Sequence, residues 1–271
     1  MRCNMNFVHE VISSPIDVRD YRINAAKNLP ETYDCPITLQ IKNQGSKPTC
    51  VAHALASLAE YHYKKQFNTS RVFSTEFIYG FRDVGYYVGD GMMLRDALKT
   101  LANVGDPFKS ECPGNNDYQK AMQNVNDNIE KYRELAYPHR ISTYYRCKSN
   151  DEIKTALMNH GPVAISMNTY QHAGLENDVY TWDPNDDYGR HCVLIIGWNE
   201  TGWIIQNSWG KSHAEDGKFT LPYSFKLNEA WGITDSIIDD DTLIRKPNAF
   251  VSWMYKVWNA LANFIINTFT K

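Results

Sequence analysis

The sequence predicts an α+β fold made of two packed subdomains, and two patterns support that prediction. After residue 50, the apolar side chains Val51, Leu55 and Leu58 recur at spacings of four and three, which marks one face of a helix. In the second half, β-branched and aromatic runs separated by Gly, Asn and Asp indicate a mostly antiparallel sheet or barrel, at 163–167, 192–198, 202–209 and 218–223. Helices therefore dominate the first half and strands the second, the order expected of two packed subdomains. The cleft between subdomains is a favoured place for a functional site.

The composition is that of an ordinary globular protein. The chain has 271 residues, of which 43% are hydrophobic and 22% charged, so disordered, collagen-like and coiled-coil chains are excluded. Its 28 basic and 31 acidic side chains give a net charge of −3, without the basic excess usual in nucleic-acid-binding proteins. The six cysteines include no CxxC pair, so neither that type of zinc site nor a thioredoxin-like motif has support. We expect no metal, no other cofactor and no nucleic-acid partner.

Further elements are predicted along the chain. Residues 1–34 are expected to be irregular, because prolines interrupt them and apolar periodicity is weak. A long helix is predicted over CVAHALASLAEYHYKKQF, directly after Pro48-Thr49. Other predicted helices cover 92–102 and 151–159, the second of which is stopped by Gly161-Pro162. The polar stretch 117–134 is either helix or loop.

The C-terminal segment 241–271 is set apart by its apolar character. Between 250 and 271, five polar residues fall within an arc of about 80° on a helical projection; they are Ser252, Lys256, Asn259, Asn263 and Asn267. The helix either packs on the domain, lies in or anchors to a membrane, or docks on a partner. Its lysine and asparagines make a clean membrane span costly.

One set of residues has the types needed for nucleophilic thiol chemistry. Cys50 stands at the predicted first turn of a helix, where the helix dipole favours a thiolate. Gln44, six residues earlier, can offer an amide donor to an oxyanion. His191 begins a predicted strand, and Asn207 ends the next one. Two strands joined by a short turn can bring these two side chains together, so that Asn207 orients an imidazole base.

These residues lie in motifs by which the chain resembles the papain-like cysteine peptidases, the cathepsin superfamily. The motifs are NQGSKPTCVAHA (43–54), RHCVLIIGW (190–198) and WIIQNSWGKSHAEDG (203–217), with family-like segments at 29–45, 89–108 and 160–165. The intervals between the cysteine, the histidine and the asparagine match the known spacing of papain and the cathepsins. The resemblance covers about 29–238.

The resemblance implies a papain-like fold, with a helical left domain, an antiparallel β-barrel right domain and the active site between them. It implies that Cys50 is the nucleophile and His191 the general base and then acid. It also implies that Asn207 orients His191, that Gln44 donates to the oxyanion, and that Trp209 shields the His–Asn hydrogen bond from water.

The same resemblance points to a substrate pocket. Gly91 stands where the family pairs with the substrate backbone, and Met92 and Met93 stand where it lines the S2 pocket, which indicates an apolar P2 side chain. Gly189 is expected to belong to the same substrate-binding region. For the two methionines, filling of the hydrophobic core is an equal alternative.

Several positions depart from the family pattern. Lys47 stands where the family has a structural cysteine, so the family's disulfide cannot form there. Val51 replaces the tryptophan after the nucleophile, and His213 replaces a second indole. Arg190 precedes the histidine where an aspartate is common, which bears on the pH profile. These changes resemble the shorter bacterial and viral branch.

The other cysteines and histidines have simpler interpretations. His53, one turn from Cys50, is predicted to pack in the core rather than act as a base. Cys192 should point to the opposite side of its strand from His191 and is predicted to be a core thiol. Free thiols are predicted at Cys35, Cys112 and Cys147.

The expected function is that of a cysteine endopeptidase, which hydrolyses polypeptide substrates through an acyl-enzyme. Residues 1–28 precede the peptidase domain, 29–240, and are expected to act as a short inhibitory leader within the cleft, whose removal raises activity. A silent papain-fold binding or structural protein, and an acyl-transfer or isopeptidase enzyme, stay open as alternatives. With no apolar signal at the N-terminus, we expect a cytoplasmic or virion-associated protein, with a membrane tether through 250–271 left open.

Overall fold

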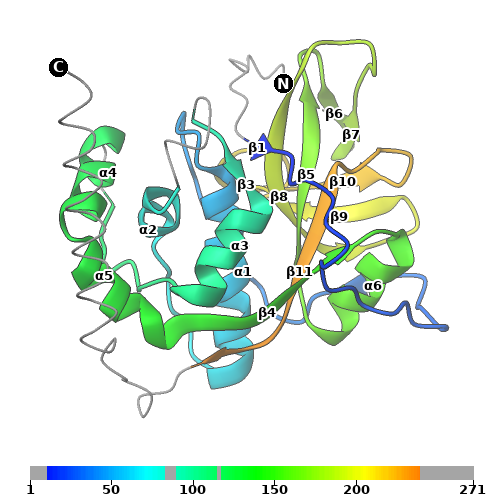
Figure 1. Cartoon of the computed structure of the whole chain (residues 1–271). Helices are drawn as coiled ribbons and strands as arrows, with labels where there is room; N and C mark the ends of the chain where they lie inside the picture. The colour runs from blue at the N-terminus through cyan, green and yellow to red at the C-terminus, as the bar shows by residue number, and fades with distance from the viewer. Residues whose placement is uncertain (1–10, 83–89, 115–116, 239–271) are drawn as a thin grey trace. The chain divides into compact units, whose positions relative to one another are not determined.

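The computed structural model describes residues 11–82, 90–114 and 117–238 (Figure 1). The predicted C-terminal helix, with its proposed membrane or partner contact, lies outside these residues. Among the helices that the structure describes, none has the length and apolar character needed to cross a bilayer.

Helices form most of the first half of the described chain. They are α1 (Cys50–Phe67), α2 (Thr75–Gly80), α3 (Leu94–Asn103), α4 (Tyr118–Asp127), α5 (Ile129–Ala136), the 3₁₀ turn η1 (Tyr137–His139) and α6 (Asn150–Asn159). α1 is the central helix: every residue from Cys50 to Tyr63 is buried, not only the predicted face. Its small alanines allow neighbouring elements to approach on all sides.

Strands form most of the second half. They are β1 (Val11–Ile12), β2 (Tyr33–Asp34), β3 (Met92–Met93), β4 (Arg140–Cys147), β5 (Val163–Tyr170), β6 (Gly174–Glu176), β7 (Val179–Thr181), β8 (Tyr188–Trp198), β9 (Gly202–Gln206), β10 (Lys218–Pro222) and β11 (Glu229–Ile238). The large sheet has the order β4-β11-β5-β8-β9-β10-β7-β6, with β2 added beside β8. All its pairings are antiparallel except that of β10 with β7.

The described residues form three hydrophobic clusters, and the two larger ones correspond to the helical and the sheet part of the predicted fold. The first gathers around α1 and α3 and includes Leu55, Leu98 and Trp231. The second lies within the sheet and under α6, and includes Trp198 and Trp203. The predicted α+β fold with helical and antiparallel parts is therefore confirmed (Figure 1).

Most elements predicted from periodicity are present, with longer or shifted bounds. The helix after Pro48-Thr49 is α1, and the four predicted strands are β5, β8, β9 and β10. The polar stretch 117–134 forms two helices, α4 and α5, which meet at Asn128. The side chain of Asp117 caps α4 by accepting from the backbone N–H groups of Gln119 and Lys120.

The prediction of a helix over 92–102 was wrong at its N-terminal end. Met92 and Met93 are extended as β3, and α3 begins only at Leu94. The reason is tertiary: β3 pairs in parallel with β1, so that Val11 lies opposite Met92 and Ile12 opposite Met93. Met92 and Met93 therefore pair with a distant segment instead of joining the helix.

The cysteine predictions agree with the structure. Cys35, Cys112, Cys147 and Cys192 carry free thiols. Cys192 is fully buried, and burial raises its pKa well above the ordinary value. A thiol in that state is inert rather than nucleophilic.

Asp106 has no exposed surface, and it feels the charge of a second buried carboxylate, Glu60, whose Oε1 lies 2.6 Å from Lys42 Nζ. Burial raises the pKa of Asp106 well above 3.8, so the folded protein holds this proton more tightly than the unfolded chain. Asp106 therefore contributes favourably to the stability of the folded protein at low pH. This contribution is lost as pH rises above the unfolded pKa.

We expect Asp106→Asn to raise the melting temperature at pH 7, because the amide resembles the protonated acid. The rise should be about 2–4 °C for each kcal/mol gained. It should shrink toward pH 4 in thermal unfolding followed by circular dichroism. The exposed substitution Asp127→Asn serves as the control, and an Asp106→Asn variant that melts lower than the parent at pH 7 would contradict the argument.

Candidate active site

Cys50 is the first residue of α1 and has no exposed surface. The first turn of α1, which is fully described, contains no acidic residue, and Thr49 before it makes no side-chain cap. The first backbone N–H groups of a helix have no partners within it, and the dipole adds positive potential there. Cys50 therefore stands at the positive end of α1, which favours an anion, while its burial opposes any charged form.

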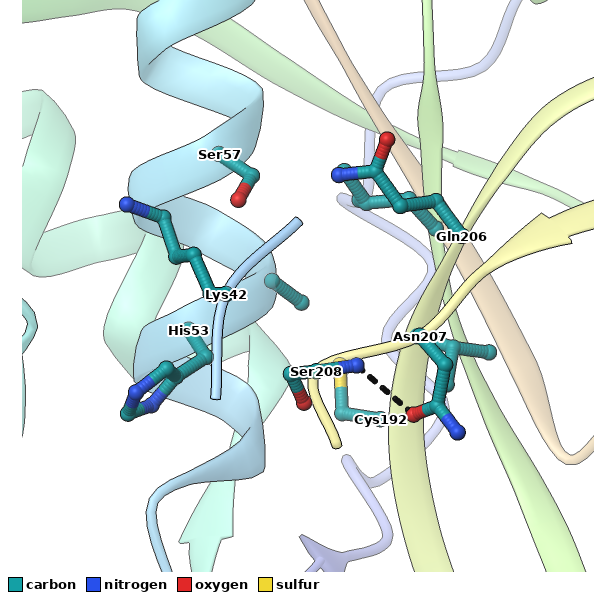
Figure 2. Close-up of a pocket in the computed structure, with 10 residues that line it drawn as sticks. Lys42, His53, Ser57, Cys192, Gln206, Asn207 and Ser208 are labelled. Atoms are coloured by element: carbon teal, nitrogen blue, oxygen red, sulfur yellow. Dashed lines mark hydrogen bonds between the residues drawn. The ribbon is translucent and has the colours of Figure 1, made fainter. Parts of the chain in front are cut away.

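His191 and Asn207 are joined by a hydrogen bond, with 2.8 Å between His191 Nε2 and Asn207 Oδ1. His191 lies within β8, and Asn207 follows the last residue of β9. These strands pair with Leu194 opposite Gln206, so both side chains come to the same end of the sheet. Asn207 Oδ1 also accepts from Ser208 N at 2.7 Å, which fixes the amide orientation (Figure 2).

An indole covers the imidazole of this pair. The rings of Trp209 and His191 are stacked, with centroids 4.4 Å apart and an interplanar angle of 17°. The ring of His213 meets the ring of Trp209 edge-on, with 4.8 Å between the two centroids. Both partners of the His191–Asn207 bond are buried, so water competes little for the bond.

The environment of His191 pushes its pKa in two directions. Burial lowers the pKa to about 4, whereas the hydrogen bond to Asn207 raises it. Burial has the larger effect, so the pKa of His191 stays below its ordinary value.

Gln44 is held rigidly at the same end of the sheet. Its backbone N donates to Ser208 O at 2.8 Å, and its side-chain Oε1 accepts from Ser208 Oγ at 2.6 Å. The amide Nε2 is thereby turned away from Ser208, and it donates to Lys47 O at 2.9 Å. Gln44 is 2% exposed, so its side chain has little room to take another rotamer.

Ser208 was not identified from the sequence. Its hydroxyl donates to Gln44 Oε1 and so selects which end of the Gln44 amide faces Ser208, and its N–H donates to Asn207 Oδ1. The only signal was its place between Asn207 and Trp209, and nothing in that position indicates a contact with a residue 164 positions earlier.

A small pocket lies between α1, the middle of β8 and the C-terminal end of β9 (Figure 2). Its walls include Lys42, His53, Ser57, Cys192, Gln206, Asn207 and Ser208. His53 Nδ1 lies 2.9 Å from Thr49 O, and burial lowers the pKa of His53 to about 4. A neutral, buried His53 bonded to its own helix fits the predicted packing role.

The predicted substrate-binding residues lie on two elements. Gly91 and Met92 are buried, Met93 is half-buried, and both methionines pair with β1. Gly189 is buried in β8, opposite Thr169 of β5. Met92 also belongs to the first hydrophobic core, so core filling and pocket lining coexist at this residue.

The N-terminal segment passes between these two elements. After β1, Ser13 Oγ accepts from Arg190 Nη1 at 2.7 Å, one residue away from His191. Ser14 is buried, and its N–H donates to Glu229 Oε1 at 3.3 Å. Residues 11–14 therefore lie beside both Met92–Met93 and the His191 strand (Figure 1).

A model of the papain family cysteine proteases matches residues 29–238. The chain belongs to the papain family of cysteine proteases. A cysteine protease of Blomia tropicalis is 28% identical over an alignment of 220 positions, which covers 72% of this chain and 62% of that protein. A viral cathepsin of Adoxophyes honmai nucleopolyhedrovirus is 23% identical over 82% of this chain and 64% of its own length. The chain thus spans somewhat less than two thirds of these relatives.

Solved structures of the family share the fold. Xylellain, a cysteine protease from Xylella fastidiosa, is 24% identical, with a TM-score of 0.75 over 87% of this chain and 99% of its own. The cysteine protease and lectin-like domains of Cwp84 from Clostridium difficile give a TM-score of 0.70 at 19% identity, over 85% of this chain and 56% of that one. The predicted resemblance to bacterial and viral members of the papain family is confirmed.

Proposed function

We propose that this chain is a cysteine endopeptidase in which Cys50 is the nucleophile and His191 the general base and acid. The observation that carries the proposal is the buried hydrogen bond of 2.8 Å between His191 and Asn207. The His191 ring stacks on Trp209, and its strand, β8, packs against α1. Membership of the papain family supports the same chemistry.

The mechanism follows from the roles of these groups. The Cys50 thiolate attacks the carbonyl carbon of a peptide bond, and the resulting oxyanion accepts from the Gln44 side chain and the Cys50 backbone N–H. Protonated His191 then gives its proton to the departing amine, which leaves a thioester on Cys50. His191 next removes a proton from water, and the hydroxide releases the acid and restores the thiolate. Asn207 holds the imidazole throughout.

The N-terminal leader is proposed to restrain this activity. Val11 and Ile12 pair with Met92 and Met93, and Ser13 accepts from Arg190 beside His191, where the family is expected to bind substrate. A substrate would compete with this segment for the same surface. The uncleaved chain is therefore a zymogen in this proposal.

The proposal predicts that an epoxysuccinyl inhibitor of papain-like enzymes adds once, on Cys50. We expect labelling of the full chain to be slow and that of a chain beginning at Ile16 to be at least about tenfold faster, because residues 11–15 no longer occupy the cleft. Intact mass and peptide mapping give the readout. A folded, truncated chain with no adduct on Cys50 would indicate a catalytically silent protein. Equal labelling rates for the two chains would contradict the inhibitory role of the leader.

A further inference from the structure

Arg190 reaches the surface on which the proposed function places the substrate. It is the residue before His191 in β8, and its Nη1 donates to Ser13 Oγ at 2.7 Å. Ser13 directly follows β1, the strand that pairs with Met92 and Met93. The guanidinium of Arg190 therefore lies on the β8 side of the strip whose other side is formed by β3.

Arg190 differs from the other arginines that the structure describes, because each of those has a carboxylate or an aromatic ring as a partner. Pairs with an aspartate or a glutamate are formed by Arg19, Arg22, Arg82, Arg95 and Arg146. Aromatic rings lie beside the guanidinium groups of Arg71, Arg133 and Arg140. Within residues 11–82, 90–114 and 117–238, Arg190 has neither kind of partner, and its one hydrogen bond goes to a neutral hydroxyl.

The nearest groups on the sheet are also neutral. Opposite Arg190 on β5 lies Asn168, whose Oδ1 already accepts from Asn228 Nδ2 at 2.8 Å. Arg190 is half-buried, so water reaches its guanidinium only in part. A guanidinium carries several N–H donors and stays protonated at every ordinary pH. One hydroxyl therefore leaves most of the binding capacity of Arg190 unused.

A carboxylate is the group that matches this side chain. Its two oxygens accept the paired N–H donors of a guanidinium in one plane, and such charge-assisted bonds are about twice as strong as neutral ones. Salt and water screen a partly buried pair less than an exposed one.

We propose that Arg190 is a specificity-determining residue that binds a carboxylate of the polypeptide substrate close to the bond that is cut. The carboxylate belongs to an acidic side chain or to the C-terminus of the substrate. This inference rests on the proposed function, because it takes the strip between β3 and β8 as the substrate site.

A second charged group restricts where this carboxylate is accepted. Ser14, the residue after Ser13, is buried, and its N–H donates to Glu229 Oε1 at 3.3 Å. The other oxygen of Glu229 accepts from Trp231 Nε1 at 2.8 Å. A substrate carboxylate that moved from Arg190 toward Glu229 would meet a like charge. We therefore expect the acidic preference at one substrate position and not at its neighbour on the Glu229 side.

The first test measures the rate at which Cys50 is labelled in the full chain. The probes are epoxysuccinyl dipeptide amides that carry Glu or Gln at the first or the second position and are otherwise identical. We expect one Glu probe to label at least about fivefold faster than its Gln counterpart, because it gains a hydrogen-bonded charge pair. In Arg190→Gln the two probes should label at equal rates. In Arg190→Glu, a Lys probe should label faster than the Glu probe.

The control variant and one further probe complete this test. Arg140→Gln should keep the preference of the parent protein, because Arg140 is also half-buried but lies over the ring of Tyr137. The Gln dipeptide is also made with a free C-terminal acid in place of its amide. Faster labelling by the free acid alone would assign the carboxylate to the substrate's C-terminus, and faster labelling by a Glu probe alone would assign it to a side chain.

A second test examines the same contact through stability and needs no probe. Ser13 is exposed, so Ser13→Asp places a carboxylate beside Arg190 without disturbing the core. We expect the Ser13→Asp chain to melt about 1–4 °C above the Ser13→Asn chain. In an Arg190→Gln background the same two variants should melt alike, because the comparison isolates the pair of residues 13 and 190.

The results separate failure of this inference from failure of the proposed function. Equal labelling by the Glu, Gln and free-acid probes, or a Glu preference that persists in Arg190→Gln, would overturn the inference while the proposed function stands. If no probe labels Cys50 in the folded chain, the proposed function itself fails. The stability comparison then decides alone, and equal melting of Ser13→Asp and Ser13→Asn in the parent background would overturn the carboxylate site.

Discussion

Replacing Cys50 with alanine is expected to abolish peptide hydrolysis and leave the fold intact. The thiolate forms the covalent bond to the substrate, and loss of such a nucleophile costs roughly 10⁴–10⁶-fold in kcat. The side chain is small and buried at the start of α1, so an alanine fits with little rearrangement. The measurement is turnover of a fluorogenic peptide library by the leader-free enzyme, with thermal unfolding in parallel.

The matched control for this prediction is Cys35→Ala. Cys35 is another free thiol, half-buried and bonded through its backbone to Ile196. Burial raises the pKa of Cys35 to about 12, so it supplies no thiolate at neutral pH. This variant should keep its turnover. If instead the Cys50→Ala enzyme keeps its turnover, the nucleophile assignment is wrong.

Asn207→Ala should lower kcat/KM by about 10²-fold, the range expected when a general acid–base loses its positioning. Asn207 Oδ1 accepts from His191 Nε2 and raises the pKa of His191. Without it, the imidazolium loses its proton at a lower pH. The basic limb of the kcat/KM profile should therefore move toward lower pH.

This pH shift separates a positioning role from a structural one. A variant that was only less stable would lose activity without moving the limb. Asn185→Ala, in an exposed turn between Asp183 and Asp186, is the control and should match the parent in both respects. An Asn207→Ala profile that superimposes on the parent profile, at any level of activity, would argue against the proposed role of Asn207.

The sequence was sufficient for elements whose signals are local. The length of α1 followed from Pro48-Thr49 and the apolar spacing after it. The runs that became β5, β8, β9 and β10 are bounded by Gly, Asn or Pro, and their burial follows from composition alone. Spacing and family motifs predict Cys50, His191, Asn207 and Gln44 as site residues. In the structure, Ser208 contacts both Asn207 and Gln44.

Elements that depend on distant pairing were not predictable in this way. β4 and β11 were missed, because RISTYYRC and EAWGITDSII mix charged or small residues with apolar ones. These two strands pair with each other, and β11 also pairs with β5, so contacts remote in sequence outweigh their local preferences. The same holds for β3, which is extended because it pairs with β1, a strand 81 positions earlier in the chain.

The sequence by itself determined the fold class, the papain-family membership and the chemical identity of the candidate site, because each depends on residue type and spacing. Only the tertiary structure decided that Ser208 orients both Gln44 and Asn207, and that β1 pairs with β3 beside the strand of His191. Those features depend on directional contacts between side chains far apart in the chain. A linear pattern of residues does not record such directions, which exist only when the elements are packed.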